Sequence, residues 1–507
     1  MSAKKFIAGI DFGTSKIRCL VFDINSNIIF SHSTLTPIIK HKSGFEYHPA
    51  NEIWNSTKKI LKLCFKDSII QKGEIKSIAC SSVGESGIPI DNKGKVLFDP
   101  MIWYDPITNN LKEGLLKKIT RYKIYNHTGL NSNPFFSAYK ILWIKKNKPK
   151  IYKKIFKWLS ISDYISWKLT GVIATDYSQA MRTLLFNPKD KKWSNFMFNK
   201  TNINKNIMPK IIPTGSYLGI INSKLSKELN LNYSCVVGLG GHDHFVGTFG
   251  LNGYKNGKII DSLGSSESIT VNTNKFIKNK NLFNNNFISG IFVTPNISNY
   301  YVVASILTSS LVIEWYKSLI NIDKINKINK INKKNGVVKN IFTFPQFRYG
   351  HSPTKNMSNS RGALWGLDLM TTKEDIYVSI MECLCFDSKH GINFIIKNTG
   401  QKIKEILCSG GASRNKIWAQ IRADVLNKPI KINRNAENVS LGTAIMGALA
   451  AKIYKDEYDV FQNIKLKNIK IRNNTKESKK YNKIFIEKYL PSIKKIDELN
   501  NIILDNN

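Results

Sequence analysis

The sequence has no apolar run that could cross a membrane. No stretch of the 507-residue chain approaches the roughly 20 consecutive apolar residues that a membrane helix needs. Residues 1–5 lead directly into the first predicted strand, which leaves no room for a signal peptide. We therefore expect a cytoplasmic protein without a membrane partner.

Cysteine is scarce, and its pattern is neither that of a disulfide framework nor that of a zinc site. The seven cysteines are odd in number, scattered along the chain and mostly placed in apolar runs. This distribution fits reduced, buried thiols. Cys383 and Cys385 are neighbours, but the chain has no second pair that would complete a zinc site.

Acidic residues are few, since 36 Asp and Glu stand against 76 Lys and Arg, and the formal net charge is +40 at pH 7. A basic surface favours polyanions such as nucleic acid. The lysines are spread along the whole chain, however, and Ile and Asn are abundant with them, as in residues 324–332. The chain carries no nucleic-acid-binding motif. A compositional bias therefore explains the charge better than a nucleic-acid partner.

The remaining composition, 42% hydrophobic and 11% aromatic, is that of a globular protein with room for two or more domains. Apolar periodicity predicts an α/β region with a helix over residues 51–65. Its predicted strands are residues 6–10, 17–22, 28–33, 78–82 and 235–239. A mixed helical stretch is predicted over residues 108–170, and the low-complexity residues 318–340 indicate an exposed insertion.

The segment Gly-Ile-Asp-Phe-Gly-Thr-Ser-Lys at residues 9–16 lies between two apolar runs and predicts strand, tight turn, strand. Gly13 permits a turn that a side chain would obstruct. Thr14 and Ser15 can offer hydroxyl and amide groups to a phosphate, and Asp11 can hold a hydrated divalent cation. An ordinary hairpin is the alternative.

The same theme returns in the second half of the chain. Gly264, Ser265 and Ser266 follow the apolar residues 258–263 and precede the apolar residues 269–271. Two strand-turn-strand loops of this kind indicate duplicated domains, each of which presents a phosphate loop.

Two longer patterns carry a family resemblance. They are FFSAYKILWIKKN at residues 135–147 and GALWGL at residues 362–367, the latter followed by DI at 375–376 and SIME at 379–382. Without the family resemblance, each pattern is equally consistent with an amphipathic element of the hydrophobic core. Both resemble the signature patterns of the FGGY carbohydrate kinase family, and residues 9–16 resemble the first phosphate loop of actin-like ATPases.

The resemblance extends from about residue 5 to about residue 455 and implies a fold. It implies an α/β protein with two actin-like (ribonuclease H-like) ATPase domains facing a central cleft. We place the N-terminal kinase domain at residues 1–247, the C-terminal domain at 248–460 and a charged, loosely attached helical tail at 461–507.

The resemblance also implies ATP and Mg²⁺ as cofactors. The segment GGASRN at residues 410–415 is similar to the family's adenosine-binding turn, which makes Gly410, Gly411 and Asn415 nucleotide-binding candidates. A strand predicted over residues 403–408 delivers these glycines to a helix N-terminus, where backbone can approach a nucleotide closely. A structural C-cap is the alternative reading of the glycines.

Asp243, in the turn Gly-His-Asp-His at residues 241–244, is the candidate catalytic base. A sugar hydroxyl is a poor nucleophile, and phosphoryl transfer needs a carboxylate that accepts its proton. Family members carry an aspartate in a Gly-rich turn at this point, and the Gly-His-Asp form is similar to that of fuculose, rhamnulose and erythritol kinases. A metal site is the alternative reading of the triplet, but it lacks further ligands nearby.

The substrate-binding candidates are Glu85, Trp103, Asp105 and His244, together with Asp243 itself. Glu85 aligns with the glutamate of an Arg-Glu pair in glycerol kinases and with the histidine of a Met-His pair in xylulose kinases. Gly84 matches neither preceding residue. Trp103 can stack on the apolar face of a sugar or fill the core.

The resemblance therefore implies an ATP-dependent carbohydrate kinase, with a ketopentose such as xylulose as the expected acceptor. Fuculose, rhamnulose, erythritol, glycerol and gluconate stay open as acceptors. A non-catalytic, nucleotide-dependent binding protein on the same fold is the alternative of another class. The expected partner is a small molecule, with a homodimer as the open alternative to a monomer.

Overall fold

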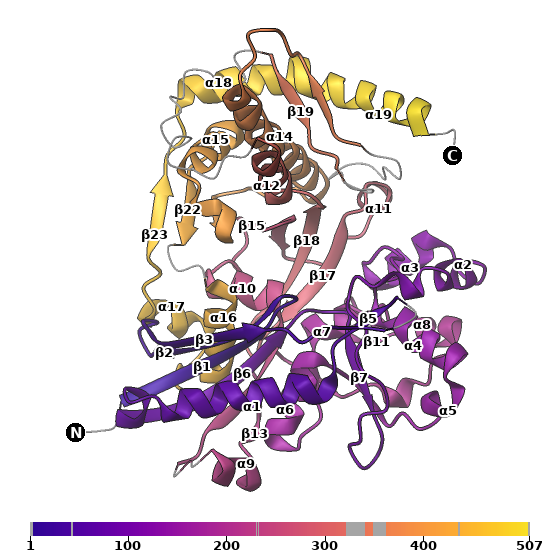
Figure 1. Cartoon of the computed structure of the whole chain (residues 1–507), viewed down its shortest axis with the longest axis vertical. Helices are drawn as coiled ribbons and strands as arrows, with labels where there is room; N and C mark the ends of the chain where they lie inside the picture. The colour runs from indigo at the N-terminus through magenta and orange to yellow at the C-terminus, as the bar shows by residue number, and fades with distance from the viewer. Residues whose placement is uncertain are drawn as a thin grey trace. The chain divides into compact units, whose positions relative to one another are not determined.

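The computed structural model describes residues 4–41, 44–229, 231, 233–320, 340–347, 361–433 and 437–504 (Figure 1). Its contacts divide the chain into two units. The first comprises Met1–Tyr254, Ser289–Tyr300 and Glu437–Leu466, and the second comprises Lys255–Ile288, Tyr301–Ala436 and Lys467–Asn507. The predicted insertion at residues 318–340 lies almost entirely outside the described residues.

The first unit is built on a six-stranded sheet, and the predicted strands and helix of this region are confirmed. In spatial order its strands are β13 (Tyr217–Ile220), β14 (Val236–His242), β6 (Gly73–Ser82), β1 (Lys4–Phe12), β2 (Lys16–Asp23) and β3 (Ile28–Leu35). The strands β14, β6 and β1 are parallel, and β2 and β3 continue as antiparallel neighbours. The central strands are apolar along their length because both faces of the sheet are covered.

Helices α1 (Ala50–Lys66) and α6 (Ile161–Thr170) cover one face of this sheet, and α16 (Asn438–Ala450) covers the other (Figure 1). Ala8 and Ile10 of β1 join the core formed with α1 and α6. Gly9 lies on the opposite face of the sheet, where an added Cβ atom would collide with the carbonyl oxygen of Ser440 in α16. Successive residues of a strand face opposite sides of the sheet. Because Gly9 has no side chain, α16 can pack directly against the backbone of β1.

Helix α16 packs closely against the sheet, and its place in the chain's organisation differs from our domain boundaries. A Cβ atom at Gly238 of β14 would lie 2.9 Å from Gly447 of α16. These contacts place Glu437–Leu466 with the first unit. A helix late in the sequence thus completes the core of the first half of the chain.

Between β6 and β14 the chain forms a largely helical region, as predicted. Its helices are α2 (Leu111–Leu116), α3 (Arg121–Thr128), α4 (Ser137–Asn147), α5 (Pro149–Tyr152), α7 (Tyr177–Met181), α8 (Asn195–Thr201) and α9 (Ser223–Glu228). Short antiparallel strands β7 (Gly87–Ile90) and β8 (Lys157–Ser160) also pair there. Gly171 ends α6 in the left-handed conformation, at φ 83°.

The second unit repeats the sheet topology of the first. Its strands run in the order β18 (Ser298–Ile306), β16 (Glu267–Thr273), β15 (Lys258–Leu263), β21 (Glu405–Ser409), β22 (Ile430–Asn433) and β23 (Asn468–Ile471). As in the first sheet, an antiparallel hairpin is followed by two parallel neighbours and then by an antiparallel edge strand. This repetition supports the predicted domain duplication.

The helices of the second unit include a long central helix, α14 (Lys373–Thr399), which packs against α12 (Ser310–Leu319) and α15 (Lys416–Leu426). The expectation of a loosely attached tail is wrong. Strand β23 pairs with β22, and the following helices α18 (Thr475–Ile484) and α19 (Leu490–Leu504) flank a fully buried Tyr489. The Tyr481 hydroxyl donates to Glu382 Oε1 at 2.7 Å.

All seven cysteines are buried and unpaired, as expected. None of the helices in the described part of the chain is long and apolar enough to span a membrane.

Candidate active site

The predicted turn at residues 13–15 connects β1 to β2. The Gly13 amide donates to the Lys16 carbonyl at 3.0 Å, and the Gly13 carbonyl accepts from the Thr36 hydroxyl at 2.8 Å. Both bonds fix the backbone of the turn. Ser15 is exposed, while the Thr14 hydroxyl accepts a hydrogen bond from Trp103.

Asp11, at the end of β1, is buried, and its carboxylate is held from two sides. Ser81 Oγ donates to Asp11 Oδ1 at 3.2 Å, and Arg18 Nη1 lies 3.8 Å from Oδ2. Thr443 of α16 donates to Ser81 Oγ at 2.8 Å and so orients that hydroxyl. Burial and the nearby charge of Asp243 raise the pKa of Asp11 to about 7.

Asp243 opens helix α10 (Asp243–Gly250) directly after β14. Its Oδ1 accepts from the His244 amide at 2.6 Å and lies 3.2 Å from His242 Nδ1. Among the described residues none donates to Oδ2, which leaves this oxygen available to a ligand. Burial raises the pKa of Asp243 to about 7, with a further contribution from the charge of Glu85. A carboxyl that titrates near neutrality suits a general base.

The turn that carries Asp243 is fixed by a polar network below it. Gly241 has φ +103°, and a Cβ atom there would lie 2.8 Å from both Asp176 Oδ2 and Ser178 Oγ. Ser178 Oγ donates to Asp176 and accepts from the His242 amide at 2.9 Å. Glycine is therefore required at 241 because the backbone is left-handed there and the space is filled.

Glu85 forms a buried ion pair with Arg182, which follows helix α7. Arg182 Nε donates to Glu85 Oε1 at 2.6 Å, and Nη2 contacts the same oxygen. Glu85 is 5% exposed and has φ 65°, a backbone conformation that non-glycine residues adopt rarely. The charges of Glu85 and Arg182 both act on the pKa of Asp243, so these three side chains share one site.

Trp103 and Asp105 lie on the loop after β7, but the structure gives them different surroundings. The Trp103 indole donates to Thr14, whereas both oxygens of Asp105 accept from backbone amides, those of Ile107 and Glu46. Asp105 thus caps a short turn, and its oxygens are already satisfied. The structure therefore shows a loop-stabilising role for Asp105, and its assignment as a substrate ligand stays a prediction.

A buried lysine supports the same loop. Lys140, within the first signature pattern, donates to the carbonyl oxygens of Phe135 at 2.7 Å and Trp103 at 3.3 Å. Burial lowers its pKa to about 8 against the opposing charges of Glu85 and Asp105. It therefore ties α4 to the backbone of Trp103.

In the second unit, the predicted phosphate loop and the predicted adenosine turn meet. Residues Gly264, Ser265 and Ser266 are exposed between β15 and β16. The Gly264 carbonyl accepts from Ser310 Oγ at 2.8 Å, at the start of α12. Gly410 has φ +87°, and a Cβ atom there would collide with the carbonyl oxygen of Leu263.

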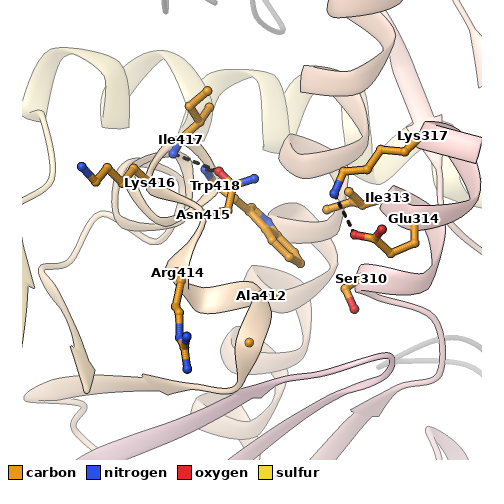
Figure 2. A pocket seen from close by; sticks show the side chains of 11 residues that line it. Ser310, Ile313, Glu314, Lys317, Ala412, Arg414, Asn415, Lys416, Ile417 and Trp418 are labelled. Carbon is orange, nitrogen blue, oxygen red and sulfur yellow. Dashed lines mark hydrogen bonds and ion pairs between the residues drawn. The ribbon is translucent and has the colours of Figure 1, made fainter. Parts of the chain in front are cut away.

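The predicted adenosine turn, the start of α15 and helix α12 line a pocket of about 590 Å³ within the second unit (Figure 2). Gly411 and Ser310 are among its lining residues, and a Cβ atom at Gly411 would meet nothing within 4 Å. Asn415 Oδ1 caps α15 by accepting from the amides of Ile417 and Trp418, each at 3.1 Å. Figure 2 shows Asn415 and Trp418 on one wall and the Lys317–Glu314 ion pair of α12 on the other. A nucleoside fits a pocket of this size.

Directly behind the phosphate loop lies a buried ion cluster. Arg422 of α15 donates to Asp261 Oδ2 at 2.5 Å and to Glu267 Oε1 at 2.9 Å. Ser388 of α14 donates to the same Glu267 oxygen at 2.5 Å. Asp261 and Glu267 flank residues 264–266, so the cluster connects the loop to the helix that follows the adenosine turn.

Sequence reasoning missed Arg182, Arg422, Ser178, Ser81 and Lys140. One signal was available for the arginines. Only nine of the 76 basic residues are arginine, and the planar guanidinium is the cation that pairs bidentately with buried carboxylates. Arg422 makes such a pair with Glu267, and Arg182 contacts one oxygen of Glu85 through two of its nitrogens. Ser81 and Lys140 also reach partners far away in sequence, and Ser178 pairs with the nearby Asp176, but none of the three left a comparable signal.

The chemistry of the site fits a divalent cation. The described residues contain no cluster of three or more His, Cys, Asp or Glu that could enclose a metal. Mg²⁺ is commonly held by one or two carboxylates together with substrate phosphates and water, so Asp11 suffices as the protein ligand. The raised pKa of Asp11 shows that its charge lacks compensation, which a cation would provide.

Known proteins resemble this chain along most of its length. Residues 6–250 match the model of the N-terminal domain of the FGGY family of carbohydrate kinases, and residues 261–451 match that of its C-terminal domain. The chain is similar to a glycerol kinase of Streptococcus uberis, at 29% identity over 90% of this chain and 91% of the relative. It is also similar to a xylulose kinase of Staphylococcus xylosus, at 27% identity over 88% of this chain and 90% of the relative.

Among solved structures, Plasmodium falciparum glycerol kinase with ADP has the same fold. It matches with a TM-score of 0.86 and 23% identity, over 97% of this chain and 99% of that chain. The two-unit, actin-like α/β fold expected from the sequence is therefore confirmed. Both family models together cover most of the chain, and the chain belongs to the FGGY family of carbohydrate kinases, as an ATP-dependent sugar kinase.

Proposed function

We propose that the protein transfers the terminal phosphoryl group of ATP to a terminal hydroxyl of a ketopentose such as xylulose or of a related small polyol. The proposal rests chiefly on Asp243. This carboxylate is held at the start of α10, keeps Oδ2 open and has a pKa of about 7. A base with these properties can accept a hydroxyl proton at neutral pH.

The other residues of the first unit orient the acceptor. The Glu85 carboxylate accepts hydrogen bonds from acceptor hydroxyls, and Arg182 holds it in place. The Trp103 ring offers an apolar face to the carbon skeleton, beside its hydrogen bond to Thr14. The acceptor hydroxyl then donates to Asp243 Oδ2. Its proton moves to that oxygen as the bond from the acceptor oxygen to the γ-phosphorus forms and the bond from that phosphorus to the bridging oxygen breaks, with ADP as the leaving group.

The nucleotide is bound by the two glycine turns and by the pocket of the second unit. Thr14 and Ser15, and Ser265 and Ser266 in the second loop, provide hydroxyl and amide donors to phosphate oxygens. Gly410, Gly411 and Asn415 contact the nucleoside in the pocket. Mg²⁺, when bound beside Asp11, neutralises phosphate charge.

An ADP-release screen of the purified protein tests the proposal. The acceptors are D- and L-xylulose, ribulose, fuculose, rhamnulose, erythritol, glycerol and gluconate, each measured against an acceptor-free control. Acceptor-dependent ADP release with xylulose in the leading group is the expected result. Nucleotide binding without acceptor-dependent turnover on any compound would favour the alternative of a non-catalytic binding protein.

A further inference from the structure

The space beside Gly84 is filled by neighbouring side chains and does not form an open subsite. A Cβ atom at this position would lie 2.6 Å from Arg182 Cγ and 2.7 Å from His242 Cδ2. Neither atom is the far end of a flexible side chain, so the two residues would have to move. Arg182 and His242 therefore fill the space that a side chain at position 84 would need.

The guanidinium of Arg182 is neutralised where it lies. It is bound to Glu85 through Nε and Nη2, and its Cζ lies 5.2 Å from the centre of the Phe136 ring. The Arg182 side chain is 14% exposed and that of Glu85 is 5% exposed. Two buried opposite charges in direct contact leave little net charge for a third group to recognise.

The remaining groups of this site add no free positive charge. Lys140 donates to two carbonyl oxygens and lies under the influence of Glu85 and Asp105. Burial and the charge of Arg182 lower the pKa of His242 well below its usual value, so its ring is neutral. The cations of Arg182 and Lys140 therefore face four carboxylates, those of Glu85, Asp105, Asp243 and Asp11.

We propose that the acceptor site selects uncharged polyols and ketoses and excludes sugar acids, and that Arg182, packed into the space at Gly84, is the residue that determines this selectivity. The inference rests on the proposed function of the same site. An acceptor carboxylate would meet the carboxylates of Glu85 and Asp243, while Arg182 is paired with Glu85 and the buried Lys140 is engaged by two carbonyl oxygens. An acceptor hydroxyl accepts from the outer N–H groups of Arg182 and donates to Glu85.

The test compares gluconate with xylulose, erythritol and glycerol in two measurements on the full-length protein. Acceptor kcat/KM is measured by ADP release, and binding is measured by the thermal shift that each compound produces without nucleotide. For the wild type we expect kcat/KM for the best uncharged acceptor to exceed that for gluconate at least 100-fold. Only uncharged acceptors are expected to raise the melting temperature.

Glu85→Gln removes the charge that neutralises Arg182 and keeps an acceptor oxygen for its N–H groups. We expect the gluconate-to-polyol ratio of kcat/KM to rise at least tenfold in this variant, even as kcat/KM for the polyol falls. Glu228→Gln, which alters a surface carboxylate that pairs with Lys58 and Lys62, serves as the matched control and should leave the ratio unchanged.

The outcomes separate the two proposals. If gluconate binds the wild type as well as any uncharged acceptor does, the proposed selectivity is wrong, whether or not the enzyme phosphorylates any of the compounds. An unchanged ratio in Glu85→Gln overturns the role of the Arg182–Glu85 pair. Selective binding of uncharged acceptors without phosphorylation of any of them overturns the proposed function and still supports the selectivity.

Discussion

The indole Nε1 of Trp103 donates to the hydroxyl of Thr14 at 3.1 Å, across 89 residues of sequence. The bond joins a residue that we assign to the acceptor to one that we assign to a phosphate. We expect Trp103→Phe, which keeps an aromatic ring and removes the donor, to raise KM for both acceptor and ATP by about three- to tenfold, the loss of one hydrogen bond. Initial-rate kinetics with each substrate varied provide the measurement. A change in acceptor KM alone would mean that the bond does not support the phosphate loop.

Asp243→Asn should keep the fold and nucleotide binding while lowering kcat by roughly two to four orders of magnitude, because the amide cannot accept the proton. The wild type should show a pH dependence of the same origin. The pKa of about 7 means that Asp243 is charged, and active as a base, above neutrality. We expect kcat/KM to rise with pH through about 7 and to level off above it. Retention of most activity in Asp243→Asn would remove this residue from the role.

We expect Asp11→Asn to raise the stability of the fold while it lowers the activity. The folded-state pKa of about 7 is higher than the ordinary value of 3.8, so the fold binds the proton more tightly than the unfolded chain does. The stability contributed by the protonated form is therefore lost as pH rises from about 4 to about 7. Without divalent cations, we expect Asp11→Asn to stabilise the protein by roughly 4 kcal/mol at pH 8 and by less than half of that at pH 5. Urea unfolding at both pH values measures the difference.

The same variant should respond weakly to Mg²⁺. If Asp11 holds the ion, Mg²⁺ stabilises the wild type at pH 8 more than Asp11→Asn, and turnover falls in the variant. Equal stabilisation of the two proteins by Mg²⁺ would contradict the assignment of Asp11 as its ligand.

Gly411→Val should weaken ATP binding without unfolding the protein. A Cβ atom at this position meets nothing within 4 Å and projects beside the pocket of the second unit. We expect KM for ATP to rise about tenfold or more, with little change in acceptor KM. Gly114→Val is the control, since that glycine also has open space around it and lies in the helical region of the first unit. Unchanged ATP affinity in a folded Gly411→Val protein would show that the nucleoside binds elsewhere.

Arg422→Met should destabilise the second unit because it leaves Asp261 and Glu267 buried without their cation. The expected loss is about 3–5 kcal/mol, measured by urea unfolding. Arg472→Met, at an exposed position, is the control and should lie within about 0.5 kcal/mol of the wild type. Combining Arg422→Met with Asp261→Asn and Glu267→Gln should recover much of the loss. If Arg422→Met alone is as stable as the wild type, the carboxyl groups of Asp261 and Glu267 are protonated in the folded protein.

Local patterns in the sequence were sufficient to predict the two strand-turn-strand hairpins. Apolar runs flank residues 9–16 and residues 264–266, and both form hairpins as expected. Helix α1 and the strands of the first sheet were also predictable, since hydrophobic periodicity is a local property that survives folding. The turn at Gly241 and the glycine pair at 410–411 followed from the same kind of signal.

Tertiary structure alone decided which residues share a site. Arg182 reaches Glu85 across 97 residues of sequence, and Thr443 reaches Ser81 across 362. It also decided that Glu437–Leu466 completes the first unit and that β23 completes the second sheet. The physical reason is the same in each case. A buried charge needs a partner and an apolar face needs a cover, but the sequence does not state which distant segment supplies them, because that depends on how the sheets order their strands.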